Sequence, residues 1–417
     1  MNNYLPKLPF VFYGVTIFAI FTMSGDLLTL LGYNFALEGG SFIYKIHPSF
    51  YLLFITFVSF FIYRDGFRFI FNVFFNEKNF YVILLCFFCF IYQAFFLGQP
   101  MAPFFVTWLT PVLLIFLFPF LSEPQKLIIK KLLICLISIN AVMGLIEYAL
   151  GSSIVPNNYY DMDNSDFVDV SDWGFERSSA LYGHPLVASF VSAIVTIGLF
   201  SKSLYFRLSS ADKVCLTLSI LSLPAFGGRF SILIVLVFCF LFLFLSLYRV
   251  LNGHKVDRKN ILLASIMLIF IPLVLFFLFN IGLFDSLISR VMDDNGSAES
   301  RLTAMYIMFD TSFSEIILGD YNSQLFIRQM LYGTKYGIEI FWVALILQLG
   351  LLFSTIMFYV LFYIIKHINF LIGKHTILSS ISFLFIVSSG TGLASKTLML
   401  SQFLLISLFI FYPFDDE

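Results

Sequence analysis

Long hydrophobic runs, separated by short polar segments, make up most of this sequence from one end to the other. Most of the runs approach or exceed the length of about 18 residues that a helix needs to cross the hydrocarbon core of a bilayer. Twelve runs can be counted, at about 9–31, 48–63, 79–98, 101–121, 127–150, 183–201, 213–226, 230–250, 261–283, 340–365, 375–392 and 397–413. The pattern predicts an all-α polytopic membrane protein with about 12 transmembrane helices, built as a single integral-membrane domain over residues 1–417.

The composition supports the same class of protein. Hydrophobic residues make up 60% of the 417 positions and charged residues only 12%, about half the charged share of an ordinary soluble chain. The sequence has no basic tract of the kind that binds nucleic acid, so the lipid bilayer is the expected partner and nucleic acid is not. All five cysteines lie inside apolar runs, and we therefore expect neither a disulfide framework nor a metal site nor a bound cofactor.

Lysine and arginine are distributed unevenly between alternate connecting segments. If the chain begins on the inner side, sixteen of its 24 Lys and Arg residues fall in inner segments and eight in outer ones. Because cytoplasmic loops carry the excess of these residues, both termini are predicted to be cytoplasmic. Two outer loops are long, at about 151–182 and 284–339. The larger contains SAESRLTAMYIMFDTSF, which can form a helix beginning near Ser297, so this loop is expected to be partly helical.

The most informative polar residues lie in the stretch 175–190, FERSSALYGHPLVASF, where the first long loop meets an apolar run. Arg177 and His184 are seven residues apart and would share one face if the stretch were helical. A fixed cation and an imidazole at a membrane surface suit the capture of an anionic headgroup. The alternative interpretation is an arginine that extends its charge to the surface beside a histidine in a polar loop.

Two acidic residues, Asp26 and Glu147, lie inside predicted spans but near their outer ends. An ionisable residue within a membrane is costly and therefore points to function. Transporters of polar substrates usually hold their site near the middle of the bilayer, whereas this chain gathers its polar residues at the outer boundary. The pattern favours an enzyme that acts on a lipid-borne substrate at the membrane surface over a carrier.

Several segments resemble, in order, the motifs of the O-antigen polymerase and O-antigen ligase superfamily. RSSALYGHPLVASF is similar to its signature of Arg, Gly, Pro and Ala, and GGRFSILIVLV to its Ser-Arg segment that opens a helix, with Gly228 where Ser is usual. SAESRLTAMYIM and the later ILGDY resemble its short arginine-bearing helix and the turn that follows. EIFWVALILQLGLLFSTIMFY resembles its entry into the next helix, so that the resemblance covers residues from about 175 to 365.

This resemblance implies a metal-independent glycosyltransferase that handles sugar chains carried on undecaprenyl diphosphate at the periplasmic side of the bacterial inner membrane. The implied partners are the undecaprenyl-diphosphate-linked oligosaccharide and, as a further candidate, a chain-length regulator protein. Guanidinium groups can hold a diphosphate bidentately without a metal. Arg177 and Arg229, at helix starts, are the predicted substrate-binding residues, with Arg301 as a third. Arg290 and Arg328 are interpreted as solvated loop charges.

Three functions fit such a protein: a polymerase that joins lipid-linked repeat units, a ligase that transfers the polymer to the lipid A core, and a flippase for lipid-linked oligosaccharides. In the ligases the large outer loop ends in a His, eleven positions before the Gly of a Gly-Leu pair. In this sequence, the residue eleven positions before Gly350 is Glu339 rather than a His. This departure from the ligase pattern favours the polymerase.

A carboxylate at position 339, beside apolar Phe341, could accept the proton of an acceptor hydroxyl. It could also orient that hydroxyl, or pair with Arg177 or Arg301. Glu339 and His184 are therefore the predicted catalytic residues.

Overall fold

The computed structural model describes residues 6–35, 39–63, 77–155, 158–160, 167–169, 177–252, 297–334, 337–390 and 392–414. The described chain is predominantly helical, which confirms the predicted class. Its strands form one short antiparallel hairpin, β1 (Asn158–Tyr160) and β2 (Phe167–Asp169), in which Tyr159 pairs with Val168.

Among the described residues, four helices are long and apolar enough to cross a membrane, which marks the chain as a membrane protein. They are α6 (Glu77–Ile91) with the π-helical turn η1 (Tyr92–Phe96), α8 (Glu123–Leu150), α9 (Pro185–Ser203) and α17 (Phe341–Ile372). Shorter apolar helices accompany them: α1 (Lys7–Thr22), α4 (Pro48–Tyr63), α7 (Thr110–Leu117) between η2 (Phe104–Leu109) and η3 (Phe118–Phe120), α18 (Ile377–Ser388) after η6 (Lys374–Thr376), and α19 (Met399–Leu405) with η8 (Ile406–Ile410). Helix α11 (Arg229–Leu251) contributes a further apolar segment, Arg229–Leu241. The predicted total of twelve spans stays a prediction, and the run 261–283 lies outside the described residues.

Two of the predicted runs differ from continuous apolar helices. The run 9–31 is divided, because α1 ends at Thr22 and α2 (Gly25–Leu30) begins after Ser24, whose Oγ accepts a hydrogen bond from the N–H of Leu27 at 3.3 Å. The run 213–226 forms α10 (Ser210–Phe226), which begins with a polar first turn and does not qualify as an apolar span.

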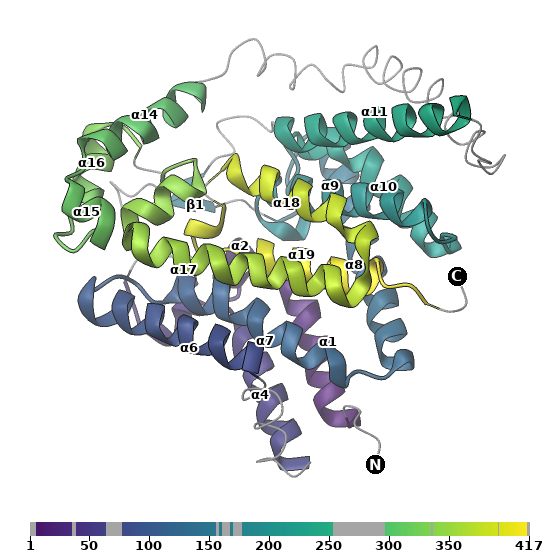
Figure 1. Ribbon diagram of the computed structural model, residues 1–417, viewed down its shortest axis with the longest axis horizontal. Coiled ribbons are helices and arrows are strands. Elements are labelled where there is room, and N and C mark those ends of the chain that lie inside the picture. Colours follow the sequence, from purple (N-terminus) through teal and green to yellow (C-terminus); the bar gives the residue numbers. More distant parts are fainter. Residues whose placement is uncertain are drawn as a thin grey trace.

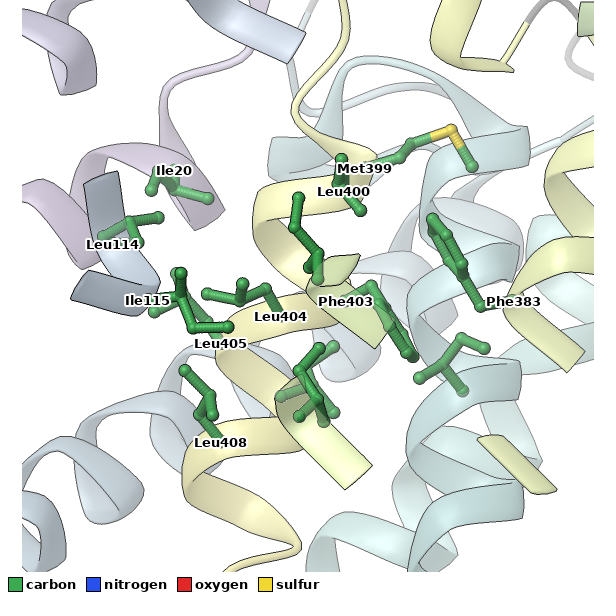
Figure 2. Packing of buried hydrophobic residues seen from close by; sticks show 14 of the residues in the cluster. Ile20, Leu114, Ile115, Phe383, Met399, Leu400, Phe403, Leu404, Leu405 and Leu408 are labelled. Carbon is green, nitrogen blue, oxygen red and sulfur yellow. The ribbon is translucent and has the colours of Figure 1, made fainter. Parts of the chain in front are cut away.

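Helix α19 and its extension η8 lie at the centre of the core. Every residue from 399 to 411 is buried, as expected of a helix that is apolar all round. Figure 2 shows Leu114 and Ile115 of α7 on one side of this helix and Phe383 of α18 on the other. The ring of Phe383 stacks on that of Phe403, with 4.2 Å between the centroids.

The direction of the helices around this core places the polar residues at two ends. Phe190, near the start of α9, contacts Phe383, in the middle of α18, with ring centroids 5.8 Å apart. Ser201, near the end of α9, donates a hydrogen bond to the carbonyl of His375, in η6 before α18. The two helices are therefore antiparallel, and the start of α9 lies at the same end as the end of α18. We call this end the site end.

The opposite end contains a buried ionic cluster. Oδ2 of Asp212, in α10, lies 3.1 Å from Nζ of Lys130 in α8 and 3.6 Å from Nζ of Lys202 in α9. Lys202 also donates a hydrogen bond of 3.2 Å to the carbonyl of Ile410. Both lysines belong to the set that the charge distribution assigns to the inner side.

The range 284–339, predicted as the second long outer loop, contains helices in its described part. Its described part contains α14 (Ser297–Asp310), α15 (Phe313–Leu318) and α16 (Leu325–Leu331). Figure 1 shows these helices gathered beside one end of α17. Ala304 and Ile307 of α14 pack there against Val343, Ala344 and Leu347, in the first half of α17.

Helix α17 is interrupted where the turn after α15 meets it. Gly350 adopts φ 79° and ψ 161°, a conformation that residues with a Cβ rarely adopt. A Cβ built on Gly350 would lie 2.4 Å from the backbone nitrogen of Gly319, and the N–H of Asp320 donates to the carbonyl of Gln348 at 3.1 Å. The ILGDY segment and the Gly350–Leu351 pair, which the sequence singled out separately, are therefore in contact.

Candidate functional site

The turn that contains Arg177 is held by a buried carboxylate. Glu147, near the end of α8, is 0% exposed. Its Oε2 accepts hydrogen bonds from the N–H groups of Ser179 (3.0 Å) and Ala180 (2.9 Å), and its Oε1 accepts one from Ile154 (2.9 Å). Ala180 adopts φ 48°, a left-handed conformation that is unusual outside glycine. Glu147, noted in the sequence as a membrane-embedded acid, therefore has the structural role of fixing this turn.

Further hydrogen bonds fasten the same turn to two helices. The hydroxyl of Ser178 donates to the carbonyl of Gly144 in α8 at 2.7 Å, and its N–H donates to the carbonyl of Ala225 in α10 at 3.0 Å. The N–H of Leu181 donates to Oδ1 of Asn140 at 3.0 Å. Residues 178–181, which directly follow Arg177, are thus fixed from several directions, as a preorganised binding site requires.

Arg177 and His184 do not share a helix face as the sequence suggested, because the chain between them forms the short turn η5 (Ala180–Tyr182) rather than a helix. His184 instead precedes α9 with an extended backbone at φ −144° and ψ 127°, as expected for a residue before a proline. Its Nδ1 accepts a hydrogen bond of 3.2 Å from the N–H of Leu186. In a neutral imidazole, the proton must then be on Nε2, which makes that atom a donor.

The electrostatic surroundings of His184 favour this neutral form. Burial lowers the pKa of His184 to about 4, and the positive charge of Arg177 acts in the same direction. The two residues are therefore close enough to interact although no helix face joins them. A neutral imidazole with a donor at Nε2 is suited to hydrogen bonding with a substrate oxygen rather than to general-base catalysis.

Asp26 lies beside the His184 turn, because the backbone of Gly183 packs closely against Ser24 and Asp26. Gly183 has φ 71°, and a Cβ built on it would lie 2.5 Å from Cβ of Ser24 and 3.3 Å from Oδ2 of Asp26. Burial raises the pKa of Asp26 to about 7. Within the described part of the chain, no hydrogen bond or ion pair holds this carboxylate. Asp26 was noted in the sequence as an acid near a helix end but was not among the predicted site residues.

Arg229 lies at the site end, at the first position of α11. A Cβ built on the preceding Gly228 would lie 2.2 Å from Oγ of Ser189 in α9, so only a glycine allows this approach of the two helices. The hydrogen bond from Ser178 to Ala225 ties the Arg177 turn to the end of α10, four residues before Arg229. The structure therefore brings the predicted residues Arg177, His184 and Arg229 to one end of the helix bundle.

Arg301 and Glu339 form an ion pair at the same end. Nε of Arg301 lies 3.7 Å from Oε2 of Glu339, and both side chains are partly exposed. Arg301 also donates to the carbonyl of Ser389 at 3.4 Å, directly after α18. Because α18 ends where α9 begins, this contact places the pair at the site end. Pairing with Arg301 was one of the roles predicted for Glu339, and the structure confirms that contact.

Arg328 is not the solvated loop charge expected from the sequence. Its guanidinium lies 2.7 Å from Oε2 of Glu315, a carboxylate whose side chain is only 4% exposed. It also donates to Oγ1 of Thr311 at 3.4 Å. The ion pair lowers the pKa of Glu315 against the opposing effect of burial, so Arg328 stabilises the helices of the loop. Arg290 lies outside the described residues.

A second His-Pro pair, which sequence reasoning missed, repeats the geometry of His184 at the same end. Nδ1 of His47 accepts a hydrogen bond from the N–H of Ser49 at 3.2 Å, and its Nε2 donates to the carbonyl of Met23 at 2.7 Å. Lys396 lies nearby and donates a hydrogen bond to the carbonyl of Phe35. Burial lowers the pKa of Lys396 to about 8, with a further contribution from Lys45. The repeated His-Pro dipeptide was the signal in the sequence.

This arrangement places arginines, a neutral imidazole donor and a carboxylate without a partner among the described residues at one end of a membrane protein. Within the described ranges, no group of three or more His, Cys, Asp or Glu residues is placed to hold a metal ion. Comparisons of the chain with protein-family models, with curated proteins and with solved structures find no match.

Proposed function

We propose that this protein is an O-antigen or other surface-polysaccharide polymerase, a glycosyltransferase that joins repeat units carried on undecaprenyl diphosphate. The observation that carries the proposal is the turn of Arg177, fixed by the Glu147 carboxylate and joined to His184, Asp26 and the start of α11. A turn fixed in this way holds a cation and polar groups ready for an anionic, lipid-borne substrate.

Arg177 and Arg229 bind the diphosphate of the donor in this proposal. As the bond between the sugar C1 and the diphosphate oxygen breaks, negative charge develops on the leaving diphosphate. Guanidinium groups fixed beside it stabilise that charge through bidentate hydrogen bonds. Arg301, paired with Glu339, is the third arginine of the site.

The acceptor is a hydroxyl group on a second lipid-linked unit. Its oxygen attacks C1 while its proton passes to a general base, and the diphosphate leaves with the bonding electrons. A general base is most effective when its pKa is near the working pH. Asp26, whose pKa burial raises to about 7, meets this condition. Glu339, in its ion pair with Arg301, orients the acceptor hydroxyl in this proposal.

The phenotype of Glu339→Gln tests the reaction class. We expect normal membrane levels and lipopolysaccharide that carries a single repeat unit and no ladder. Cells that lack the whole protein should show the same single unit, because a lost ligase would leave bare core with polymer still on the lipid carrier. Bare core in such cells would contradict the polymerase, and a normal ladder from Glu339→Gln would remove this residue from the reaction.

We further propose that the site end faces the periplasm of a bacterial inner membrane and that both termini are cytoplasmic. The excess of Lys and Arg in the segments assigned to the inner side supports this orientation. Phosphatase fusions after Asp169 and Glu315 should be active, and a β-galactosidase fusion after Lys259 should be active instead. Phosphatase activity at Lys259 would reverse the orientation.

A further inference from the structure

A small cavity lies beside the interruption of α17. It has a volume of about 200 Å³, below the roughly 300–1,000 Å³ of pockets that bind drug-sized ligands. Gln93, Gln99, Trp108 and Gln348 supply its polar groups, and Phe104 supplies a second aromatic ring. The space therefore suits one small ring rather than a chain of several.

Three irregular helical segments supply residues that line this cavity. Gln93 belongs to the π-helical turn η1, and Phe104 and Trp108 belong to the π-helical turn η2. Gln348 lies two residues before the non-helical Gly350 in α17. π-Helical turns are rare and often mark functional sites. Within a membrane, irregular backbone is tolerated where it lines a cavity or is buried in protein. Three such segments around one cavity indicate a binding site rather than a packing defect.

Hydrogen bonds orient two of the glutamines. Nε2 of Gln93 donates to the carbonyl of Pro100 at 3.1 Å, and Nε2 of Gln99 donates to the carbonyl of Gln348 at 2.9 Å. With their amide nitrogens held by the backbone, both side chains keep Oε1 as an acceptor.

The other two polar side chains supply donors. Trp108 is only 3% exposed, and within the described chain its indole N–H has no hydrogen-bond partner. The side-chain amide of Gln348 likewise has none among those residues. Both residues line the cavity, so an acceptor oxygen of a bound group would satisfy these two donors.

The lining selects a class of ligand. None of the described residues that form the cavity is charged, whereas a diphosphate or carboxylate would require a cation. An acyl chain would displace water from the amide and indole groups without replacing its hydrogen bonds, which is costly. A sugar ring offers hydroxyl groups that donate and accept, together with C–H faces that pack on aromatic rings.

Two segments that line the cavity are neighbours in the sequence of residues proposed for the reaction centre. Leu393 and Ala394, which form part of its wall, follow Ser389, the residue bonded to Arg301. Leu345, in the first turns of α17, lies six residues after Glu339. We propose that this cavity binds one neutral sugar residue of the lipid-linked substrate and so contributes to the choice of acceptor or donor unit. The link to that substrate rests on the proposed function, whereas the binding of a neutral sugar does not.

Saturation-transfer NMR with the purified full-length protein tests the inference directly. The probes are the methyl glycosides of glucose, galactose, N-acetylglucosamine and rhamnose, with methyl glucuronide as a charged comparison. We expect transfer to at least one neutral glycoside and a weaker signal from the glucuronide. Gln348→Leu and Trp108→Phe should each weaken binding about tenfold, equivalent to about 1.4 kcal/mol.

Matched controls keep the experiment decisive. Gln324→Leu removes an exposed glutamine outside the cavity, and Trp342→Phe changes a tryptophan that does not line it. Both should bind like the unchanged protein. Gln348→Leu should fold, because the structural contacts of Gln348 are made by its backbone carbonyl.

Absence of transfer to all four neutral glycosides would overturn the inference, as would unchanged binding by both cavity variants. If the unchanged protein binds a neutral glycoside and the cavity variants do not, but the unchanged protein makes no polymer, the sugar site stands and the polymerase proposal falls. If polymer forms normally and no glycoside binds, only the sugar site falls.

Discussion

Replacement of Glu147 by glutamine should release the turn that presents Arg177. The carboxylate accepts three backbone N–H groups, from Ile154, Ser179 and Ala180. A glutamine keeps one acceptor oxygen, and its NH₂ group cannot accept a hydrogen bond. At least one of the three bonds is therefore lost, and those that remain no longer have a charged acceptor.

The size of this effect follows from the number of bonds. A hydrogen bond to a charged group contributes roughly 1.5–3 kcal/mol and a neutral one roughly 0.5–1.5 kcal/mol. Losing one charged bond and weakening two others amounts to about 4 kcal/mol for holding the turn closed. Since 1.4 kcal/mol corresponds to a factor of ten, the open form of the turn should become roughly a thousandfold more populated.

Hydrogen exchange measured by mass spectrometry on peptides covering residues 177–184 reports this opening. We expect much faster exchange there in Glu147→Gln, together with loss of long-chain product and near-normal amounts of protein in the membrane. Glu299→Gln, at an exposed position of α14, is the matched control and should behave like the unchanged protein. Unchanged exchange and a normal ladder in Glu147→Gln would refute the reasoning.

Three further predictions concern the site itself. Arg177→Lys and Arg229→Lys should each lose about 2 kcal/mol of transition-state stabilisation, or roughly thirtyfold in rate, because lysine lacks the bidentate fork of arginine. Arg207→Lys, at the opposite end of the bundle, is the control. Long chains at normal density from either site variant would remove that arginine from the site. His184→Ala should weaken chain synthesis and His184→Gln should restore part of it, as for a hydrogen-bond donor. Equal loss in both, with synthesis that persists in Asp26→Asn, would make His184 the base. Asp26→Asn should abolish synthesis, and the rate of the unchanged protein should rise with pH through about 7, because the base must be ionised. Because the pKa of Asp26 in the folded protein lies above its ordinary value, ionisation of this carboxyl destabilises the fold, and stability falls as pH rises toward 7. Above pH 7, Asp26→Asn should therefore melt at a higher temperature than the unchanged protein. A lower melting temperature for Asp26→Asn would contradict the burial of this carboxylate.

Local sequence signals predicted the parts of the site that depend on neighbouring residues. The proline at 185 favours the extended backbone of His184, and the segment after Ser297 predicted α14. The role of Glu147 could not be predicted in the same way, because its partners Ser179 and Ala180 lie more than 30 residues away in the sequence. Only tertiary structure separates a carboxylate that binds backbone amides from one that binds substrate.

The same limit applies to the sugar cavity. Gly350 was recognised as part of a motif, but its contact with Gly319 depends on how α15 packs against α17. The π-helical turns that carry Gln93 and Trp108 have no clear sequence signature, since both lie in apolar runs that read as regular helices.

Polymerisation by the purified protein is the most direct test of the central proposal. The protein is reconstituted in liposomes with undecaprenyl-diphosphate-linked repeat units, with a metal chelator present, and the lipid-linked products are separated by size. We predict a ladder of longer lipid-linked chains with release of undecaprenyl diphosphate, and no ladder from Arg177→Lys. Products no longer than one repeat unit from the unchanged protein, or an equal ladder from Arg177→Lys, would contradict the account.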